Sequence, residues 1–370
     1  MTSSLPNTLD PDRIRLARMR RGHTKLSLAR ALGVTDRTIH KYETGLAPLS
    51  TAEKLASSLN YPVAYFTRPL EIEIETGSTN YRAGRDTTSK SRNAAEAAGI
   101  TGIEISQWIR EHFTLPLLHV PVFGKEKPQL AAQMLREEWA LGTKPLPNLV
   151  QLCESKGITV FGLPQLAKSV DAFSWRYDSQ PYIYLSRQKT PERTRFDIAH
   201  ELGHLVLHKN AEVKTTPEQE READQFASEF LMPRSTLAEY LPRNATIDAI
   251  LDAKNAFKVS ALALTYTLHK NGYMTDWIYR STCLELSQRG YRRGEPEGML
   301  SHEFSRVFPQ VLGADKGGTV TVGRIAEELA LPSDDVTTLM MQPRFEVLEG
   351  DKDENNRART NKPPKLSLVH

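Results

Sequence analysis

Residues 196–208 read FDIAHELGHLVLH, and this stretch has the periodicity of an α-helix with two different faces. Five ionisable residues share about 100° of arc on a helical wheel, opposite the apolar side: Asp197, His200, Glu201, His204 and His208. Histidines four residues apart lie one turn apart, about 6 Å along the axis, so both imidazoles can bind the same ion. We therefore predict a metal site on this helix, with His200 and His204 as ligands.

The pattern H-E-x-x-H also places a carboxylate beside the first histidine. Glu201 projects next to the ion without needing to bind it, so it can take a proton from a zinc-bound water and return it to a leaving amine. Zinc lowers the pKa of that water towards ~7 and polarises a carbonyl. We predict Glu201 as the general base and Zn²⁺ as the cofactor, although the same ligands accept other divalent ions.

A third ligand has to come from elsewhere in the chain. His208 lies about 12 Å along the helix from the first histidine, so we predict that it supports the ligands rather than binding the ion. The next acidic segment, PEQEREADQFASEFLMP, carries Glu220 and Asp224 one turn apart. We predict Glu220 as the ligand and Asp224 as the partner of a ligating histidine. Glu222, about 200° around the helix, is the competing ligand, and an ordinary solvated acidic face is the remaining alternative.

The N-terminal region differs from the rest in charge. Residues 1–70 hold 11 Lys and Arg against 5 Asp and Glu, a net charge of +6, whereas the other 300 residues have a net charge of −3. Short apolar bursts at helical spacing predict a bundle of short helices. A turn at Gly33 and a helix cap at Thr35 are typical of a helix-turn-helix, which reads the major groove of double-stranded DNA. The alternative is a protein-interaction module with a solvated basic face.

Residues 12–68 resemble Xre-type, lambda-repressor-like domains through the pattern A-x-x-L-G-V-T-x-x-T-I-x-x-Y-E, which begins at Ala29. By position, the resemblance implies that four residues of the second helix contact an operator: Arg37, Thr38, His40 and Lys41. Such domains usually carry Gln where this chain has Lys25. Lys25 keeps a phosphate contact but puts a specific polar contact in doubt. Domains of this type often dimerise to read two half-sites, and no heptad seam decides between a monomer and a homodimer.

The body of the chain resembles the ImmA/IrrE family of zinc metallopeptidases over about residues 119–290. Four segments carry the resemblance: LREEWALGTKPLPNLVQLCESKGITVFG (135–162), SQPYIYLSR (179–187), RTRFDIAHELGHLVLH (193–208) and EREADQFASEFLMP (220–233). The resemblance implies a zincin-like fold with two histidines and a glutamate as ligands and Glu201 as the base. Known relatives cleave repressor proteins, so it also implies a repressor as the protein substrate.

The predicted fold class is α+β and mostly helical, with an all-α N-terminal domain and a small sheet in the peptidase domain. Five regions are predicted: an Xre-type helix-turn-helix domain at 1–69, a linker and helical connector at 70–118, a zincin-like domain at 119–245, a helical C-terminal region at 246–350 and a disordered tail at 351–370. The linker proper covers 76–93. Strands are predicted at 70–75, 158–162 and 181–185. The last strand, PYIYL, either pairs at the sheet edge with an extended substrate or lies in the sheet interior.

These observations predict a cytoplasmic DNA-binding regulator fused to a zinc endopeptidase. No stretch reaches the ~18 apolar residues of a membrane span, the N-terminus lacks a signal-peptide core, and two distant cysteines make no disulfide framework. The main alternative is a non-proteolytic repressor or antitoxin-like regulator whose zinc fold is a sensor or interaction module. A further alternative is self-cleavage in the linker at 76–93. Glu201 favours catalysis, because a purely structural zinc site needs no base.

Overall fold

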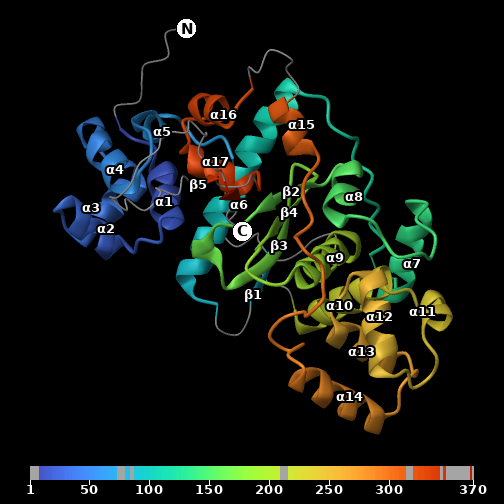
Figure 1. Ribbon diagram of the computed structural model, residues 1–370. Coiled ribbons are helices and arrows are strands. Elements are labelled where there is room, and N and C mark those ends of the chain that lie inside the picture. The colour runs from blue at the N-terminus through green and yellow to red at the C-terminus, as the bar shows by residue number, and fades with distance from the viewer. Residues whose placement is uncertain are drawn as a thin grey trace, which may run out of the picture.

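The computed structural model describes residues 8–72, 80–83, 87–124, 126–208, 216–313, 320–341, 345–346 and 367–368. Within these residues, 17 α-helices surround one four-stranded sheet, and a second pair of strands has two residues each (Figure 1). The predicted fold class, α+β and mostly helical, is therefore confirmed. Of the tail predicted at 351–370, only Ser367–Leu368 (β6) is described, and it pairs with Phe345–Glu346 (β5).

Five short helices form the N-terminal bundle: α1 (Pro11–Arg20), α2 (Lys25–Leu32), α3 (Asp36–Lys41), α4 (Ala52–Leu59) and α5 (Val63–Thr67). A π-helical turn at Tyr42–Leu46 and a 3-10 turn at Leu49–Thr51 connect α3 to α4. Gly33 ends α2 with a φ of 68°, in the left-handed region that favours glycine. Thr35 then caps α3, since its hydroxyl accepts a hydrogen bond from the Thr38 N–H. This is the turn and cap of a helix-turn-helix.

The main sheet has the strand order β1-β3-β4-β2. Its strands are β1 (Asn80–Ala83), β2 (Thr159–Gly162), β3 (Val170–Tyr177) and β4 (Gln180–Leu185). Strand β3 runs antiparallel to both β1 and β4, whereas β2 runs parallel to β4. Strand β4 contains the PYIYL segment and is interior, so the edge-strand alternative for it is wrong.

Two sequence predictions near the start of the sheet are corrected. The linker predicted at 76–93 contains β1 and also the first turns of a long helix, α6 (Ser89–His112), whose cap is the Thr88 hydroxyl. The strand predicted at 70–75 is absent from residues 70–72, and residues 73–75 lie outside the described part of the chain. Alternating apolar and acidic letters predicted a strand there, but β pairing needs a partner strand that local sequence does not reveal.

The two faces of the sheet pack on two different helices. Helix α6 covers one face so closely that a Cβ on Gly102 would lie 2.7 Å from Tyr184 Cε1, and the Tyr184 hydroxyl donates to the Gly99 carbonyl over 2.7 Å. Helix α9 (Pro191–Leu207) packs against the other face. The alternation of β3 explains this, because Phe173 belongs to the core on the α6 side and Ala172 to the core on the α9 side.

The remaining helices divide between these two cores. The core on the α9 side also contains residues of α7 (Pro128–Glu138), α8 (Leu149–Ser155), α10 (Pro217–Leu231), α11 (Arg234–Tyr240), α12 (Ile247–Phe257) and α13 (Ala261–Lys270). Helix α14 (Asp276–Gln288) packs on α13. The core on the α6 side takes in the N-terminal bundle together with α15 (Val307–Gly313), α16 (Val322–Glu328) and α17 (Ser333–Leu339). Helices far apart in sequence thus share one core with the N-terminal bundle (Figure 1).

Buried ion pairs hold the N-terminal bundle to α6 and α17. The Arg20 guanidinium lies 2.7 Å from the Asp335 carboxylate, and Arg21 approaches the same carboxylate at 3.0 Å. Arg13 of α1 lies 2.6 Å from Glu104 of α6. The Arg13, Arg20, Glu104 and Asp335 side chains are all nearly buried, so breaking either contact would leave an unpaired buried charge. The bundle is therefore a fixed part of the body.

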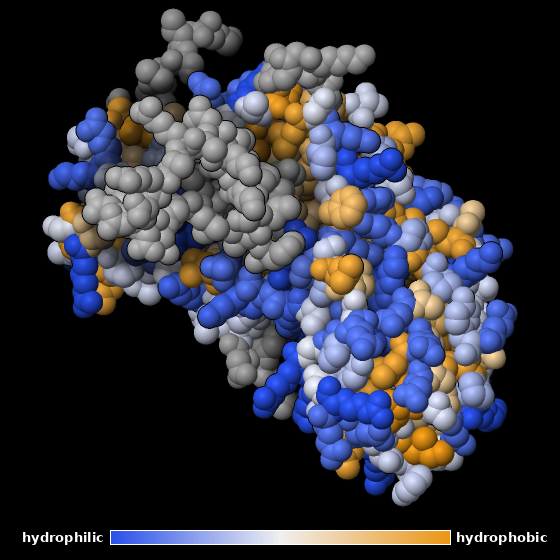
Figure 2. All heavy atoms as spheres, viewed as in Figure 1, coloured by the Kyte–Doolittle hydropathy of each residue, from blue (hydrophilic) through white to orange (hydrophobic). Residues whose placement is uncertain are grey.

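Figure 2 shows a mostly hydrophilic face over the region of α12–α14, with hydrophobic residues interspersed. Among the described residues, no helix combines the length and the apolar character that crossing a bilayer requires.

Candidate functional site

Helices α9 and α10 bring together the three predicted metal ligands. His200 Nε2 lies 3.0 Å from His204 Nε2, and the two oxygens of Glu220 lie 3.4 Å from His200 Nε2 and 3.5 Å from His204 Nε2. Ligands about 2.0–2.1 Å from a tetrahedral zinc ion are about 3.3–3.4 Å apart. The two separations that involve Glu220 are close to this value, whereas the histidines lie nearer to each other, and a three-residue ligand set would leave a fourth position open.

The local sequence explains why the two helices meet here. Pro191 starts α9 after the Thr190 cap, and Thr216 and Gln219 form a reciprocal capping box at the start of α10. Gly203 lets α10 approach, because a Cβ at this position would lie 3.0 Å from Phe226 Cδ1. The turn of α9 that carries His200 and His204 thus faces the first turns of α10.

Asp224 orients the first histidine. Its Oδ1 lies 2.8 Å from His200 Nδ1, and the His200 side chain is fully buried. A carboxylate only accepts hydrogen bonds, so it holds the proton on Nδ1 and leaves the Nε2 lone pair directed at the other ligands.

A longer hydrogen-bond chain orients the second histidine. His208, just past the end of α9, lies 3.0 Å from His204 Nδ1 through its own Nδ1, and its Nε2 lies 2.9 Å from Glu222 Oε2. Glu222 keeps the His208 proton on Nε2, so His208 Nδ1 accepts from His204 Nδ1–H and the Nε2 of His204 is left as a ligand atom. Burial lowers the pKa of His208, against the opposing effect of Glu222, so the neutral form required by this chain is favoured. Glu222 therefore contacts His208 and not the ligand atoms.

Glu201 lies beside the ligands in an asymmetric environment. Its side chain is buried, with 1% exposure, and its Oε2 accepts a hydrogen bond of 2.8 Å from the Ser174 hydroxyl on β3. Its Oε1 is buried and has no hydrogen-bond partner in the described part of the protein. One oxygen is thus fixed while the other can bind a proton. Ser174 is a site residue that sequence reasoning missed, because its strand has two buried faces and its sequence, VDAFSWRY, gives no clear local signal.

These observations fit a divalent metal ion. The two imidazoles and one carboxylate are zinc ligands of ordinary type, both histidines have partners on their other ring nitrogen, and a buried carboxylate oxygen adjoins them. In the described part of the chain, ligand atoms of His200, His204 and Glu220 all lie within 4.8 Å of one another. The arrangement can hold a metal and a base within one buried centre.

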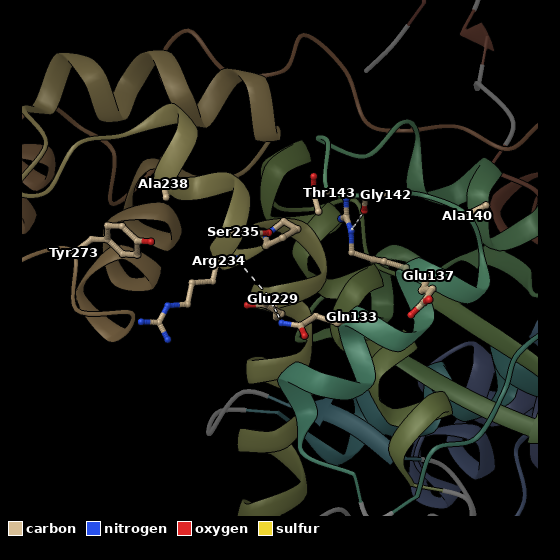
Figure 3. A pocket seen from close by; sticks show the side chains of 12 residues that line it. Gln133, Glu137, Ala140, Gly142, Thr143, Glu229, Arg234, Ser235, Ala238 and Tyr273 are labelled. Carbon is tan, nitrogen blue, oxygen red and sulfur yellow. Dashed lines mark hydrogen bonds between the residues drawn. The ribbon is translucent and has the colours of Figure 1, made fainter.

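A large cavity lies away from this centre. It has a volume of about 870 Å³ and lies between α7, the C-terminal end of α10 and α11 (Figure 3). Arg136 in its wall donates to the carbonyls of Gly142, Lys144 and Phe230. Its guanidinium therefore connects the loop that follows α7 to the end of α10. None of the three candidate metal ligands lines this cavity.

The residues predicted to contact DNA lie at the outer edge of the N-terminal bundle. Arg37, His40 and Lys41 are exposed on α3, and Thr38 is half-buried. Lys25 is engaged within the protein, because its Nζ lies 3.4 Å from Glu43 and 3.1 Å from His40 Nδ1. The α3 face is thus open to a ligand, whereas Lys25 has to leave Glu43 to reach a phosphate.

Comparison with known families matches the two parts of the chain separately. The family described as Helix-turn-helix matches residues 14–66, and the family described as IrrE N-terminal-like domain, of the M78 peptidases, matches residues 153–269. A comparison with curated proteins gives no match. The two matches support an Xre-type helix-turn-helix domain at residues 14–66 fused to an ImmA/IrrE domain at residues 153–269.

Proposed function

We propose that the protein is a DNA-binding transcriptional regulator whose ImmA/IrrE domain is a zinc-dependent endopeptidase that cleaves a protein substrate. The supporting observation is the environment of Glu201, with one oxygen held by Ser174 and the other buried and unpaired next to His200, His204 and Glu220. A site that only bound zinc would have no use for such a carboxylate.

The residues divide the chemistry between them. His200, His204 and Glu220 would hold the zinc ion, which when bound supplies Lewis acidity towards a water molecule and a peptide carbonyl. Glu201 would take up a proton at Oε1 and return it to the leaving amine, and Ser174 keeps the other oxygen in place during both transfers. The buried setting makes each of these charge interactions stronger than in water.

The partners follow from the two domains. Double-stranded operator DNA would contact α3 through Arg37, Thr38, His40 and Lys41. A repressor protein is the substrate class that the family resemblance suggests, and a homodimer would allow two half-sites to be read. Cys153 and Cys283 are free, which fits the proposed location in a reducing cytoplasm.

The catalytic part is tested by metal content and by new protein termini. Wild type and Glu201→Gln should each carry about one zinc per chain, whereas His204→Ala should carry none. Incubation with a bacterial lysate should produce new N-termini with wild type only, because Glu201→Gln keeps the metal and loses the base. Equal yields of new termini from wild type and Glu201→Gln would overturn the mechanism.

A second candidate function is regulation without proteolysis, with the zinc fold as a sensor. The observation that favours it is the rigid attachment of the N-terminal bundle, through Asp335 and Glu104, to the same core that lies on the sheet. A change in the sheet would then reach the DNA-binding helices. Zinc-dependent binding of a selected DNA duplex, with no new termini in the lysate experiment, would support this function instead.

DNA binding itself is tested by selecting duplexes from a random library and titrating them with variants. Arg37→Ala should weaken binding by about 1–3 kcal/mol if it contacts a base, and Lys41→Ala should lower the salt dependence by about one counterion if it contacts a phosphate. Arg221→Ala, an exposed arginine on α10, is the matched control and should have no effect. Unchanged binding by both α3 variants would contradict the assigned surface.

A further inference from the structure

The strand that holds the base lies next to the sheet edge. Ser174 on β3 contacts Glu201, and on its two sides β3 is paired with β4 and with β1. Neighbouring strands lie about 4.8 Å apart. The β1 position is therefore one strand away from the residue that holds Glu201, on the side of the sheet opposite β4 and β2.

An extended peptide pairs with an open sheet edge through its backbone, largely independently of its side chains. In this chain the edge of β3 is already filled by β1. The register places Asn80 opposite Ser174, Tyr81 opposite Phe173 and Arg82 opposite Ala172. Strand β1 is thus aligned with Ser174 in the way that an antiparallel peptide bound at this edge would be.

Strand β1 has the properties of a replaceable strand. It has four residues, and its register with β3 shifts between Arg82 and Ala83, whereas β3 and β4 pair in unbroken register over six residues. A short edge strand with an irregularity contributes little to sheet stability. The core strands therefore do not need β1 to stay together.

Strand β1 also belongs to the connection between two anchored elements. On one side Arg68 Nη1 donates to the Glu328 carbonyl over 2.8 Å, and on the other side the Thr87 hydroxyl donates to the Ser169 carbonyl over 3.0 Å. The N-terminal bundle and α6 are held to each other by their own buried ion pair, Arg13 with Glu104. Neither neighbour therefore depends on the pairing of β1 with β3 for its position.

We propose that the β1 edge of β3 is the surface to which an extended segment of the protein substrate adds, and that β1 occupies this surface in cis as an autoinhibitory strand. This inference rests on the proposed peptidase function. The substrate class that follows is a protein with a segment able to become an unpaired strand, and compactly folded proteins are poor substrates. Cleavage then requires β1 to be displaced first.

Peptide binding tests the inference without any cleavage. All proteins carry Glu201→Gln, and the probe is a fluorescein-labelled peptide with the sequence of residues 78–85, STNYRAGR. Tyr81→Pro with Arg82→Pro removes two consecutive backbone N–H groups, so one of them is a group that faces β3. Tyr81→Ala with Arg82→Ala changes the same side chains and keeps both N–H groups, which makes it the matched control. Fluorescence anisotropy gives the affinity.

The double-proline variant should bind the peptide at least ten-fold more tightly than the reference protein and the double-alanine control. A cis strand that fills the edge nine-tenths of the time raises the apparent Kd ten-fold. Hydrogen exchange should show loss of protection in β3 amides of the double-proline variant only. Should that variant fail to fold, as judged by circular dichroism, Tyr81→Gly with Arg82→Gly replaces it and should show a smaller gain of the same sign.

Two results would overturn the inference. Unprotected β3 amides combined with unchanged peptide affinity would mean that the free edge is not a docking surface. Unchanged protection in the double-proline variant would mean that β1 does not cover the edge. Because every protein carries Glu201→Gln, absence of proteolysis in the wild type would leave these results unaffected, and the two proposals fail separately.

Discussion

Replacing Glu222 should weaken zinc binding although Glu222 does not reach the ligand atoms. In Glu222→Ala the His208 Nε2 loses the carboxylate 2.9 Å away that holds its proton. The His208 proton can then move to Nδ1, which faces His204 Nδ1 at 3.0 Å, so two N–H groups would point at each other. His204 is then driven towards the form with its proton on Nε2, where the metal should bind.

The expected loss follows from the position and exposure of Glu222. Removing a direct partner of a metal ligand costs about 10–100-fold in affinity. Glu222 acts through one intervening histidine, and its side chain is 36% exposed, so water replaces part of the interaction. We therefore expect about ten-fold weaker zinc binding, or about 1.4 kcal/mol. Glu222→Gln keeps a carbonyl acceptor and should lose only about two- to three-fold.

Competition with a chelator of known zinc affinity measures these values. Glu218→Ala is the matched control, because Glu218 lies on the same helix in an exposed ion pair with Arg221 and should leave zinc affinity unchanged. Glu220→Ala, which removes a proposed ligand, should abolish tight binding. The melting temperatures of the metal-free proteins should agree, which separates loss of affinity from loss of fold.

Two outcomes would refute this reasoning. A Glu222→Ala protein with affinity within about two-fold of wild type would show that the chain through His208 does not orient His204. A Glu222→Ala protein that loses zinc as completely as Glu220→Ala would show that Glu222 does more than orient His204 through His208.

Two further predictions concern stability. Gly102→Ala should lower the free energy of unfolding by about 1–3 kcal/mol in a urea titration, since its Cβ would lie 2.7 Å from Tyr184, whereas Gly323→Ala, with its nearest atom at 3.6 Å, should be neutral or stabilising. Burial, together with Arg187, lowers the pKa of His302 to about 4, so the unfolded chain binds this proton at higher pH than the folded one. The free energy of unfolding should therefore fall between about pH 6.5 and pH 4, and less so in His302→Gln.

The helix-borne part of the site was predictable because it depends on spacing alone. His200 and His204 share a face because residues four apart on a helix lie one turn apart. Glu220 and Glu222 fall on different sides of α10, so Glu220 faces those two histidines and Glu222 faces His208. His208 contacts His204 through its Nδ1 and is not among the three residues whose ligand atoms converge, so its supporting role stays a prediction.

The sheet-borne part was not predictable from local sequence. Strand β3 was missed because VDAFSWRY has apolar residues on both faces, so it lacks the alternation of a half-exposed strand; both of its faces are buried, one under α6 and one under α9. Because β3 was not predicted, Ser174 and its contact with Glu201 were not predicted either. Strand β1 lies in a polar, Ser- and Thr-rich segment, and only its pairing with β3 makes it a strand.

The carboxylate of Asp335 has a consequence for how the protein is made. Arg20 and Arg21 are synthesised 315 and 314 positions before the partner that neutralises them. At about 5–20 residues per second, a ribosome needs roughly 15–60 s to cover that distance. During this interval the nascent N-terminal bundle exposes two cationic side chains and the apolar surface that α16 and α17 later cover. The N-terminal bundle is thus translated well before the segment that completes its core.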